Sequence, residues 1–415
     1  MRHEPATHAN ERYIQLLLFL IPFLMGCGVD LYIPSLPAIA TQFQVPNRSV
    51  QMTIALYMLG FGLGQAVLGV LSDLFGRKII IIGSTIFYTV TSFSIALYSP
   101  TILHLIAERF IQGFAIGGMA VSCRAMIADC YRGLKMHKTL TLLSIGFGLG
   151  PIIGPLIGAY LQYYFDWQAA FYFFGIYGGL ILLVIILKLP ETSLNRHERH
   201  LKKIFKTIVT INLNITFITC TLWGALTYSF LVVFTAVSPF LIQNTLDYSV
   251  IDYGKIIFLL GFGYFSGTIS NRFLLNHFSP MQNTRYGLIG ILVFSVGLLG
   301  LAQLAPYSIR TLMPPIGGIF FFSGLVFPNS MTKSIELFSH SAGIVAALYG
   351  TWLGVVVAVM TTLTGWLNIN SQQNLAMLFI SMLTMSALLF IASIRSLDVT
   401  QRISPSESTE ATNPI

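Results

Sequence analysis

Charged side chains are scarce in this chain of 415 residues: Asp, Glu, Lys and Arg make up 9%, against 55% hydrophobic residues. Soluble domains carry about 25% charged residues, so a water-soluble globular protein is excluded. Residues 337–394 contain no Asp, Glu, Lys or Arg at all. A helix needs about 20 apolar residues to cross the core of a bilayer, so this stretch alone can cross twice. The sequence therefore predicts a polytopic, all-α membrane protein.

Cysteine is also rare, and its placement excludes two kinds of site. The four cysteines, Cys27, Cys123, Cys130 and Cys220, all fall in apolar segments. None has the spacing of zinc ligands, and no soluble region is large enough to need a disulfide framework. We interpret them as small packing residues and expect no metal and no bound cofactor.

Apolar runs separated by charged or Pro- and Asn-rich breaks predict twelve spanning helices. They cover about residues 13–35, 50–72, 79–98, 101–128, 138–164, 167–188, 210–242, 253–274, 284–304, 308–332, 342–366 and 373–394. The longest hydrophilic connection separates six helices from six. We therefore expect two pseudo-symmetric six-helix bundles, in residues 1–188 and 208–395. A cytoplasmic linker, residues 189–207, joins them, and residues 396–415 form a disordered tail.

The basic residues predict the orientation of these spans. An even number of spans puts both termini on one side. If that side is the cytoplasm, then of 23 Lys and Arg residues only Arg48, Lys255 and Arg310 face the opposite side, and Arg109 lies within a helix. Basic residues concentrate on the cytoplasmic side of membrane proteins. This bias explains the net charge of +8 without a nucleic-acid partner.

A faint internal repeat accompanies the twelve spans. The run Gly60-Phe61-Gly62-Leu63-Gly64 recurs letter for letter at residues 146–150, and glycine-rich faces return in every third predicted helix. Small residues let helices approach closely. Nested three-helix repeats are typical of one transporter architecture. The alternative is that membrane helices are rich in glycine in any case.

One carboxyl group, that of Asp30, lies inside the first predicted span. An ionisable side chain at membrane depth is costly and requires a reason. Removal from water favours the neutral acid, so such a group can take up a proton on one side and release it when its surroundings change. We interpret Asp30 as a candidate proton site. The alternative is a carboxylate near the outer interface that caps a helix or reaches the headgroups.

Arg109 lies inside the fourth predicted span, followed by Gln112 and Gly113. A guanidinium keeps its charge, so it must face a polar cavity, a carboxylate or backbone carbonyls. Near Asp30 it would make protonation of that acid responsive to substrate, whereas a purely structural role is the alternative. The neighbouring Glu108 must point to another side of the helix, and we expect it nearer the outer surface.

The connection between the second and third spans, Gly69-Val70-Leu71-Ser72-Asp73-Leu74-Phe75-Gly76-Arg77-Lys78, combines a glycine turn with charges. Gly76 permits the turn, while Arg77 and Lys78 fix the loop at the surface. Asp73 can accept from helix amides or pair with a basic residue. Such a contact, made between the two halves, would exist in one conformation only and act as a latch.

The fifth span contains five glycines and two prolines, among them Gly146, Gly150, Pro151, Gly154, Pro155 and Gly158. Proline in mid-helix removes a backbone hydrogen bond and kinks the helix, and glycine thins one face. This pattern predicts a helix that bends or slides against a partner.

Together these motifs resemble the major facilitator superfamily over essentially the whole chain. Residues 69–78 resemble its loop 2–3 signature, and Arg109 with Gln112-Gly113 and the Gly150-Pro151 run resemble the motifs of its drug:proton antiporters. Asp30-Leu31-Tyr32-Ile33-Pro34-Ser35-Leu36-Pro37, Arg124 to Asp129 and Ser238-Pro239-Phe240 are similar to the Bcr/CflA group of bacterial exporters. The resemblance implies a proton-driven, inner-membrane multidrug efflux pump for small organic compounds such as antibiotics, usually a monomer.

The resemblance also implies roles for residues. Asp30 is the expected proton and substrate site and Arg109 its electrostatic partner. The residues of the loop signature would stabilise the outward-open state, and the fifth span would seal the interface between the halves. The second-half loop has Asn271 where the first has an acid, so the latch is expected on one side only. Aromatic candidates for the cavity wall are Tyr32, Tyr57, Trp223, Tyr228 and Tyr349.

Two other functions stay open at this point. A carrier of the same fold could export a dedicated metabolite, such as a siderophore or small peptide, or less readily import one. A membrane-embedded enzyme or a channel is disfavoured, because the sequence has no nucleophile–base pair or metal cluster and its soluble segments are short.

Overall fold

The structure, a computed structural model, describes residues 8–192 and 201–403. All elements in these ranges are helical, as predicted: α1 (His8–Asp30), η1 (Ile33–Ser35), α2 (Leu36–Gln42), α3 (Asn47–Phe75), α4 (Arg77–Leu97), α5 (Ile102–Cys130), α6 (Gly133–Phe165), α7 (Gln168–Lys188), α8 (Leu201–Leu213), α9 (Ile215–Pro239), η2 (Phe240–Thr245), α10 (Val250–Leu274), α11 (Pro280–Leu304), α12 (Ile309–Glu336), η3 (Ser339–Ser341), α13 (Ala342–Trp366) and α14 (Gln372–Ile403).

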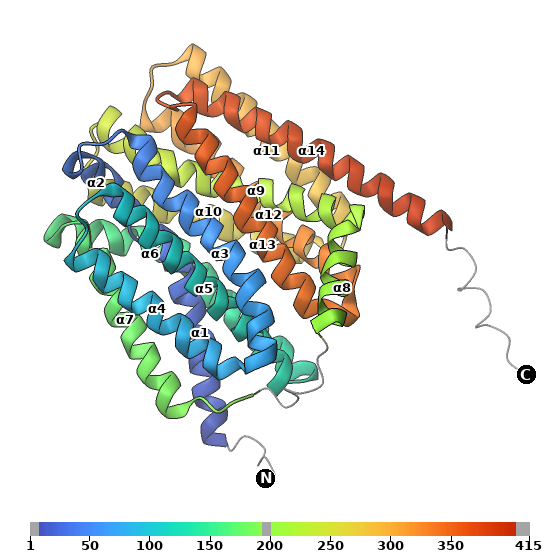
Figure 1. The fold of residues 1–415 in the computed structure, drawn as a ribbon. Coiled ribbons are helices and arrows are strands. Elements are labelled where there is room, and N and C mark those ends of the chain that lie inside the picture. Colours follow the sequence, from blue (N-terminus) through green and yellow to red (C-terminus); the bar gives the residue numbers. More distant parts are fainter. Residues whose placement is uncertain (1–7, 193–200, 404–415) are drawn as a thin grey trace, which may run out of the picture.

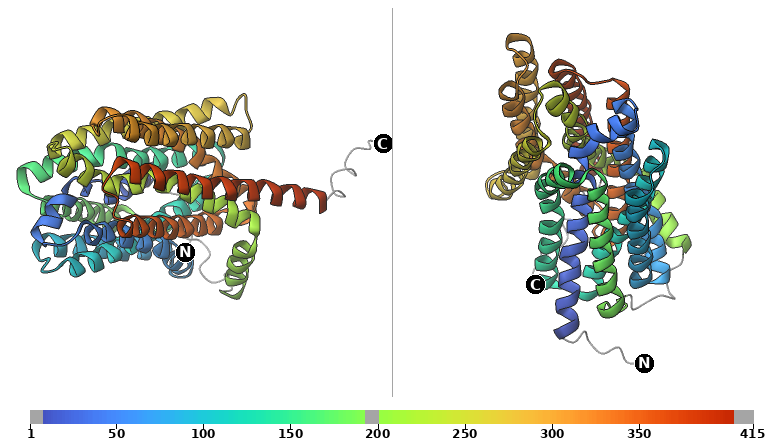
Figure 2. Two further views of the ribbon diagram at one scale, coloured as in Figure 1. Left: turned by 90° about the horizontal axis from the view of Figure 1, so that it is seen from above. Right: turned by 90° about the vertical axis from the view of Figure 1, so that its left-hand side faces the viewer.

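The long helices run side by side along one direction, so the bundle has two ends (Figure 1, Figure 2). We call them the α2 end, where α1 passes into α3 through η1 and α2, and the α8 end, where α8 and the start of α1 lie. Within the described residues, eleven segments are long and apolar enough to cross a membrane. The remaining predicted span falls on α10, which is 25 residues long and carries Asp252, Lys255 and Arg272. The count of twelve stays a prediction.

Two helix pairs in the first half of the chain are held together by glycines. Across α3 and α5, a β-carbon on Gly60 or Gly64 would run into the backbone of α5, and one on Gly113 into the backbone of Tyr57. Across α1 and α6, Gly26 meets the backbone at Gly150 in the same way. In both copies of the Gly-Phe-Gly-Leu-Gly run, glycines thus contact the backbone of a neighbouring helix, because only glycine permits such a close approach.

The two halves of the chain meet along α3 with α13 and along α6 with α10. Gly62 of α3 faces Gly354 of α13, and a β-carbon built on Gly62 would lie 3.3 Å from the Gly354 Cα. Gly261 of α10 faces Ile152 of α6 in a similar contact. The fifth predicted span, α6, therefore does lie at the interface. Its motif glycines, however, face their own half: Gly146 and Gly150 meet the backbone of α1, and Gly154 and Gly158 meet the backbone at Leu31, directly after α1.

Two hydrogen bonds between the halves lie at the α2 end. Gln51 Nε2 donates to the Ala236 carbonyl over 3.2 Å, and Gln243 Nε2 donates to the Pro34 carbonyl over 3.0 Å. They tie α3 to α9, and η1 to η2. The halves are thus bonded to each other through polar contacts at this end.

Two segments differ from the prediction. Residues 396–403 continue α14 as helix rather than starting a disordered tail. The predicted linker contains the start of α8, whose Lys202, Phe205 and Lys206 are exposed. On its other face Ile211 is buried, and Trp352 of α13 donates to Asn212 over 2.9 Å. An apolar stripe repeating with the helical period explains why this charged segment folds as a helix.

Replacing Gly150 by alanine is expected to destabilise the protein. The added methyl group would overlap the backbone of Gly26 and Cys27, which cannot move without displacing α1. Overpacking of this kind costs about 1–3 kcal/mol. Gly148→Ala in the same helix is the matched control, because nothing lies within 4 Å of a β-carbon there. Thermal unfolding in detergent should show a midpoint several degrees lower for Gly150→Ala alone. Equal midpoints for both variants would contradict the α1–α6 contact.

Candidate functional site

The first spanning helix breaks at Asp30. The local sequence explains the break, because Pro34 stands four residues later and has no N–H to donate to the Asp30 carbonyl. The helix α1 ends at Asp30, and the chain resumes as the 3₁₀ turn η1 and then α2. Interrupted helices in transporters place side chains and backbone carbonyls at binding sites. The sequence predicted one uninterrupted helix over 13–35, so the break is new.

Arg109 on α5 is fully buried beside this break. Its Nη2 donates to the Gly28 carbonyl on α1 over 2.8 Å, and its Nη1 donates to Gln112 Oε1 over 2.8 Å. The guanidinium also lies between two aromatic rings, with its Cζ 4.3 Å from the ring centre of Tyr32 and 4.1 Å from that of Tyr57. Stacking on aromatic faces and bonding to neutral acceptors stabilise a buried guanidinium.

The partners of Arg109 are themselves held in place. Gln112 Nε2 donates to Ser92 Oγ over 2.7 Å, and Ser92 Oγ donates to the Tyr88 carbonyl over 2.6 Å. These bonds fix which end of the Gln112 amide faces the guanidinium. The Tyr32 hydroxyl shares a 2.7 Å hydrogen bond with Thr53 Oγ1 of α3. Arg109 therefore sits in a network that joins α1, α3, α4 and α5.

Glycine is required at position 28 for the same arrangement. A β-carbon there would collide with the hydroxyl of Tyr57 and would lie 3.5 Å from that of Tyr88. Both hydroxyls are buried and lack a hydrogen-bond partner in the part of the chain that the structure describes. These two hydroxyl groups can therefore form hydrogen bonds to a polar ligand or to water.

The Asp30 carboxyl group is partly buried. It interacts electrostatically with Tyr57 of α3 and with Tyr228 and Tyr253 of the second half. Among the described residues, no hydrogen bond or ion pair joins it to Arg109, whose two bonds go to Gly28 and Gln112. Asp30 and Arg109 are thus near each other through shared tyrosines, while the acid remains available to other partners.

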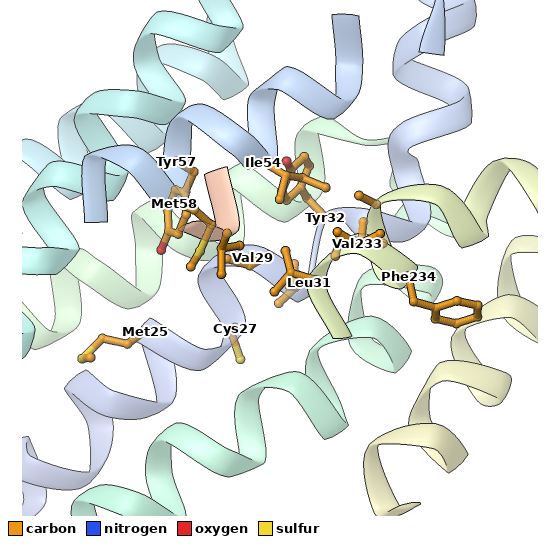
Figure 3. Close-up of a cluster of buried hydrophobic side chains, with 14 of the residues drawn as sticks. Met25, Cys27, Val29, Leu31, Tyr32, Ile54, Tyr57, Met58, Val233 and Phe234 are labelled. Carbon is orange, nitrogen blue, oxygen red and sulfur yellow. The ribbon is translucent and has the colours of Figure 1, made fainter. Parts of the chain in front are cut away.

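The five aromatic candidates divide into two groups. Tyr32, Tyr57 and Tyr228 lie around Asp30 and Arg109. Figure 3 shows Tyr32, which lies between α1 and η1, and Tyr57 of α3 within an apolar cluster that also includes Val233 of α9. The other two lie elsewhere: Trp223 packs on Phe390 of α14, and Tyr349 shares a hydrogen bond with Ser330 of α12. Spacing alone could not separate these groups.

A second buried polar contact lies further along α5. Arg124 donates to Gln65 of α3, and a β-carbon on Gly350 of α13 would overlap the Gln65 amide. Gln65 is therefore in contact with the second half of the chain. The sequence analysis singled out Arg124 but missed Gln65, although a glutamine directly after the Gly60–Gly64 run was a usable signal.

The loop signature forms a cluster of charges at the α8 end. Arg77 donates through Nη1 to Asp73 over 2.5 Å and through Nε to Asp129 of α5 over 3.0 Å. Glu191 accepts from the backbone N–H groups of Arg77 and Lys78, so it stabilises the start of α4. These bonds stay within the first half of the chain. A latch between the halves stays a prediction.

The second half has a neutral network at the corresponding place. Asn271 donates to Asn329 Oδ1 over 3.0 Å and accepts from Asn283 over 3.2 Å. All three side chains are buried. Amide groups bond to one another here without charge.

Replacing Arg77 by glutamine is expected to lower stability. The guanidinium is only 5% exposed and lies between two carboxylates, and hydrogen bonds to charged groups contribute about 1.5–3 kcal/mol each. Thermal unfolding should show a clear loss for Arg77→Gln and little change for the control Lys78→Gln. If both variants unfold at the wild-type temperature, the cluster does not stabilise this end of the bundle.

Comparisons with known proteins agree with this picture. The Major Facilitator Superfamily sequence model matches residues 18–361. An uncharacterized transporter of Rickettsia bellii (strain RML369-C) is 28% identical, over 87% of this chain and 91% of its own. Multidrug resistance protein D of Escherichia coli (strain K12) is 27% identical, over 89% and 93%. A bicyclomycin resistance protein homolog of Haemophilus influenzae is 30% identical, over 46% and 47%.

Solved structures share the fold. The partially occluded, inward-open xylose transporter XylE from E. coli has a TM-score of 0.72 at 14% identity, covering 94% of this chain and 98% of its own. The D-xylose-proton symporter has a TM-score of 0.70 over 93% and 97%. The family match, the relatives and the helical bundle confirm the resemblance inferred from the motifs. The chain is a multi-pass membrane transporter, not an enzyme, and it belongs to the Major Facilitator Superfamily, where it resembles the drug:proton antiporters.

Proposed function

We propose that this protein exports small organic compounds, including antibiotics, across the inner membrane of a bacterium in exchange for protons. In this proposal the α8 end is cytoplasmic, both termini lie there, and the protein works as a monomer. The proton gradient supplies the energy, so no cofactor is needed. The observation that carries the proposal is the position of Asp30: an acid at the break of α1, two residues after the carbonyl that accepts from the buried Arg109, and within electrostatic range of tyrosines of both halves.

The chemistry of this place suits exchange between a proton and a substrate. A carboxyl group that is partly removed from water can be neutralised by a proton or by a cationic or hydrogen-bonding compound. The two cannot neutralise it at the same time, so binding of one releases the other. Arg109 keeps a fixed positive charge nearby and thereby limits how long the acid stays protonated. One proton crossing 100 mV supplies about 2.3 kcal/mol, enough for substantial accumulation.

Alternating access requires the halves to separate at one end and close at the other. The contacts of Gln51 and Gln243 hold the α2 end together in this structure. We propose that these two bonds break when the substrate is released to the outside. The names of several relatives, multidrug resistance protein D and a bicyclomycin resistance protein homolog, support drugs as the substrate class.

Transport in proteoliposomes tests the proposal. Purified protein is reconstituted, a pH gradient of either direction is imposed, and the movement of a panel of cationic, neutral and anionic antibiotics is measured. We expect accumulation of some compounds against their gradient, on the side from which protons leave, and its loss on addition of a protonophore. Transport that proceeds equally with and without the gradient would refute proton exchange. If the protein transports metabolites but none of the antibiotics, drugs are not its substrates, although exchange with protons still stands.

A further inference from the structure

The helix α8 differs in direction from the helices that span the membrane. It follows α7 in the chain and precedes α9. In Figure 1 and in the left view of Figure 2, it runs across the long helices at the α8 end instead of along them. Because the long helices cross the membrane, a helix that runs across them lies roughly parallel to the membrane plane.

The depth of α8 follows from the spans beside it. In α14 the uncharged run of residues 337–394 ends at Arg395, which is exposed. Since charged side chains are costly in the core of a bilayer, the headgroup region begins close to Arg395. Thr216 in the first turn of α9 donates to Ser396 Oγ over 2.9 Å, so the start of α9 lies at the same depth. Only one residue separates α8 from α9, which places the end of α8 in the headgroup region.

One face of α8 is docked on the second half of the chain. Ile211 is buried in an apolar cluster with Phe217 of α9 and Val345 of α13. On the same side of the helix, Trp352 Nε1 donates to Asn212 Oδ1 over 2.9 Å. These contacts fix the rotation of α8 about its own axis and thereby decide which side chains point away from the protein.

A second apolar stripe of α8 points away from the protein. Phe205, Val209 and Leu213 stand four residues apart and so share one face of the helix. They are 68%, 38% and 79% exposed. Exposure of such side chains to water is unfavourable, whereas contact with acyl chains at the membrane surface is favourable. The stripe therefore fits the boundary between headgroups and acyl chains.

The row of side chains beside this stripe is polar and basic. It consists of Lys202, Lys206 and Thr210, all of them exposed. Over its 13 residues α8 has three lysines and no acidic residue, and Arg395 adds a further positive charge at the same depth. A lysine can lay its methylene groups on the membrane surface while its ammonium group reaches the headgroups. The charge is thus complementary to anionic lipid headgroups, which attract basic residues close to the membrane.

We propose that α8 is a membrane-surface helix that binds anionic phospholipids. Its apolar stripe of Phe205, Val209 and Leu213 lies among the acyl chains, and Lys202 and Lys206 contact the headgroups. Because α8 is docked on α9 and α13, the bound lipids are attached to the second half of the chain. The proposal does not depend on which compound is transported or on protons.

Tryptophan fluorescence of the full-length protein tests which face of α8 enters the membrane. Phe205→Trp and the matched control Thr210→Trp are placed in vesicles of phosphatidylcholine and phosphatidylglycerol whose acyl chains carry bromine, which quenches tryptophan. Relative to the wild type, we expect additional quenching in Phe205→Trp and none in Thr210→Trp. Quenching of neither variant would mean that water or another protein chain covers the stripe, and it would overturn the proposal. Equal quenching of both would overturn it too, because α8 would then have no oriented face.

The affinity for two lipids tests the role of the lysines. Phe205→Trp in detergent is titrated with brominated phosphatidylglycerol and with brominated phosphatidylcholine, and the two dissociation constants are compared. We expect tighter binding of phosphatidylglycerol, and a preference that falls about tenfold when Lys202→Gln and Lys206→Gln are added. Adding Lys255→Gln instead should leave the preference unchanged, because Lys255 lies on α10 and is exposed there.

Three results of this titration decide against the proposal. They are equal affinity for the two lipids while both lysines are present, the same preference after both are replaced, and an equal loss with Lys255→Gln. If the double lysine variant does not fold, added salt provides the test in Phe205→Trp alone. Salt screens exposed charges, so it should weaken binding of phosphatidylglycerol and leave that of phosphatidylcholine unchanged. Equal effects of salt on both lipids would refute binding through the lysines.

Discussion

Asp30→Asn is expected to reduce proton-driven transport to the level of protein-free vesicles. Asparagine has nearly the same shape, so the break of α1 before Pro34 should persist. It cannot bind and release a proton, however, and the exchange loses the group that both ligands share. Transport driven by a pH gradient should therefore vanish, whereas exchange of labelled for unlabelled neutral substrate across equilibrated vesicles should remain.

The matched control is Asp247→Asn. Asp247 is exposed at the α2 end and has a positive φ of 57°, a conformation that asparagine adopts readily. It should transport like the wild type. If Asp30→Asn retains gradient-driven accumulation, Asp30 is not the coupling acid.

Arg109→Lys is expected to have the second-largest effect. A lysine ammonium is a compact charge that cannot lie flat between the rings of Tyr32 and Tyr57 while bonding to the Gly28 carbonyl and Gln112. Hydrogen bonds to charged groups contribute about 1.5–3 kcal/mol each. We expect the melting temperature to fall by several degrees and transport to fall by at least about tenfold, which corresponds to about 1.4 kcal/mol in the barrier.

Arg310→Lys is the control for this change, because Arg310 is exposed at the start of α12. It should alter neither quantity. Normal transport in Arg109→Lys would mean that positive charge alone is sufficient at this position. The bonds to Gly28 and Gln112 would then serve only to hold α1 against α5.

The helices were predictable because their signal is simple. Long apolar runs bounded by charges mark where a chain enters and leaves a bilayer, and predicted spans such as 79–98 and 167–188 differ from α4 and α7 by one or two residues. The break after Asp30 was harder, since Pro34 lies within an otherwise apolar run. Nor could the pattern say which neighbour a glycine face meets. Gly150 contacts α1, whereas Ile152, on another side of α6, contacts Gly261 in the second half of the chain.

The candidate site was predictable in its charges but not in its partners. An acid and an arginine within apolar spans are conspicuous, and the structure puts Asp30 at the break of α1 and buries Arg109 fully beside that break. The acceptor that Arg109 uses is the backbone carbonyl of Gly28. Every residue has such a carbonyl, so no sequence pattern distinguishes this one. Glu191 was missed for a related reason, because a helix start accepts an acid from any nearby segment.

The networks at the α8 end give the two halves different sensitivity to the solution. Carboxylates and a guanidinium join the α3–α4 turn to α5 in the first half, whereas Asn271, Asn283 and Asn329 join the equivalent helices of the second half. Amides do not titrate and attract no counter-ions. High salt therefore weakens the contacts of the first half at this end more than those of the second half, so the two sets of helices differ in how their hold on one another depends on the solution.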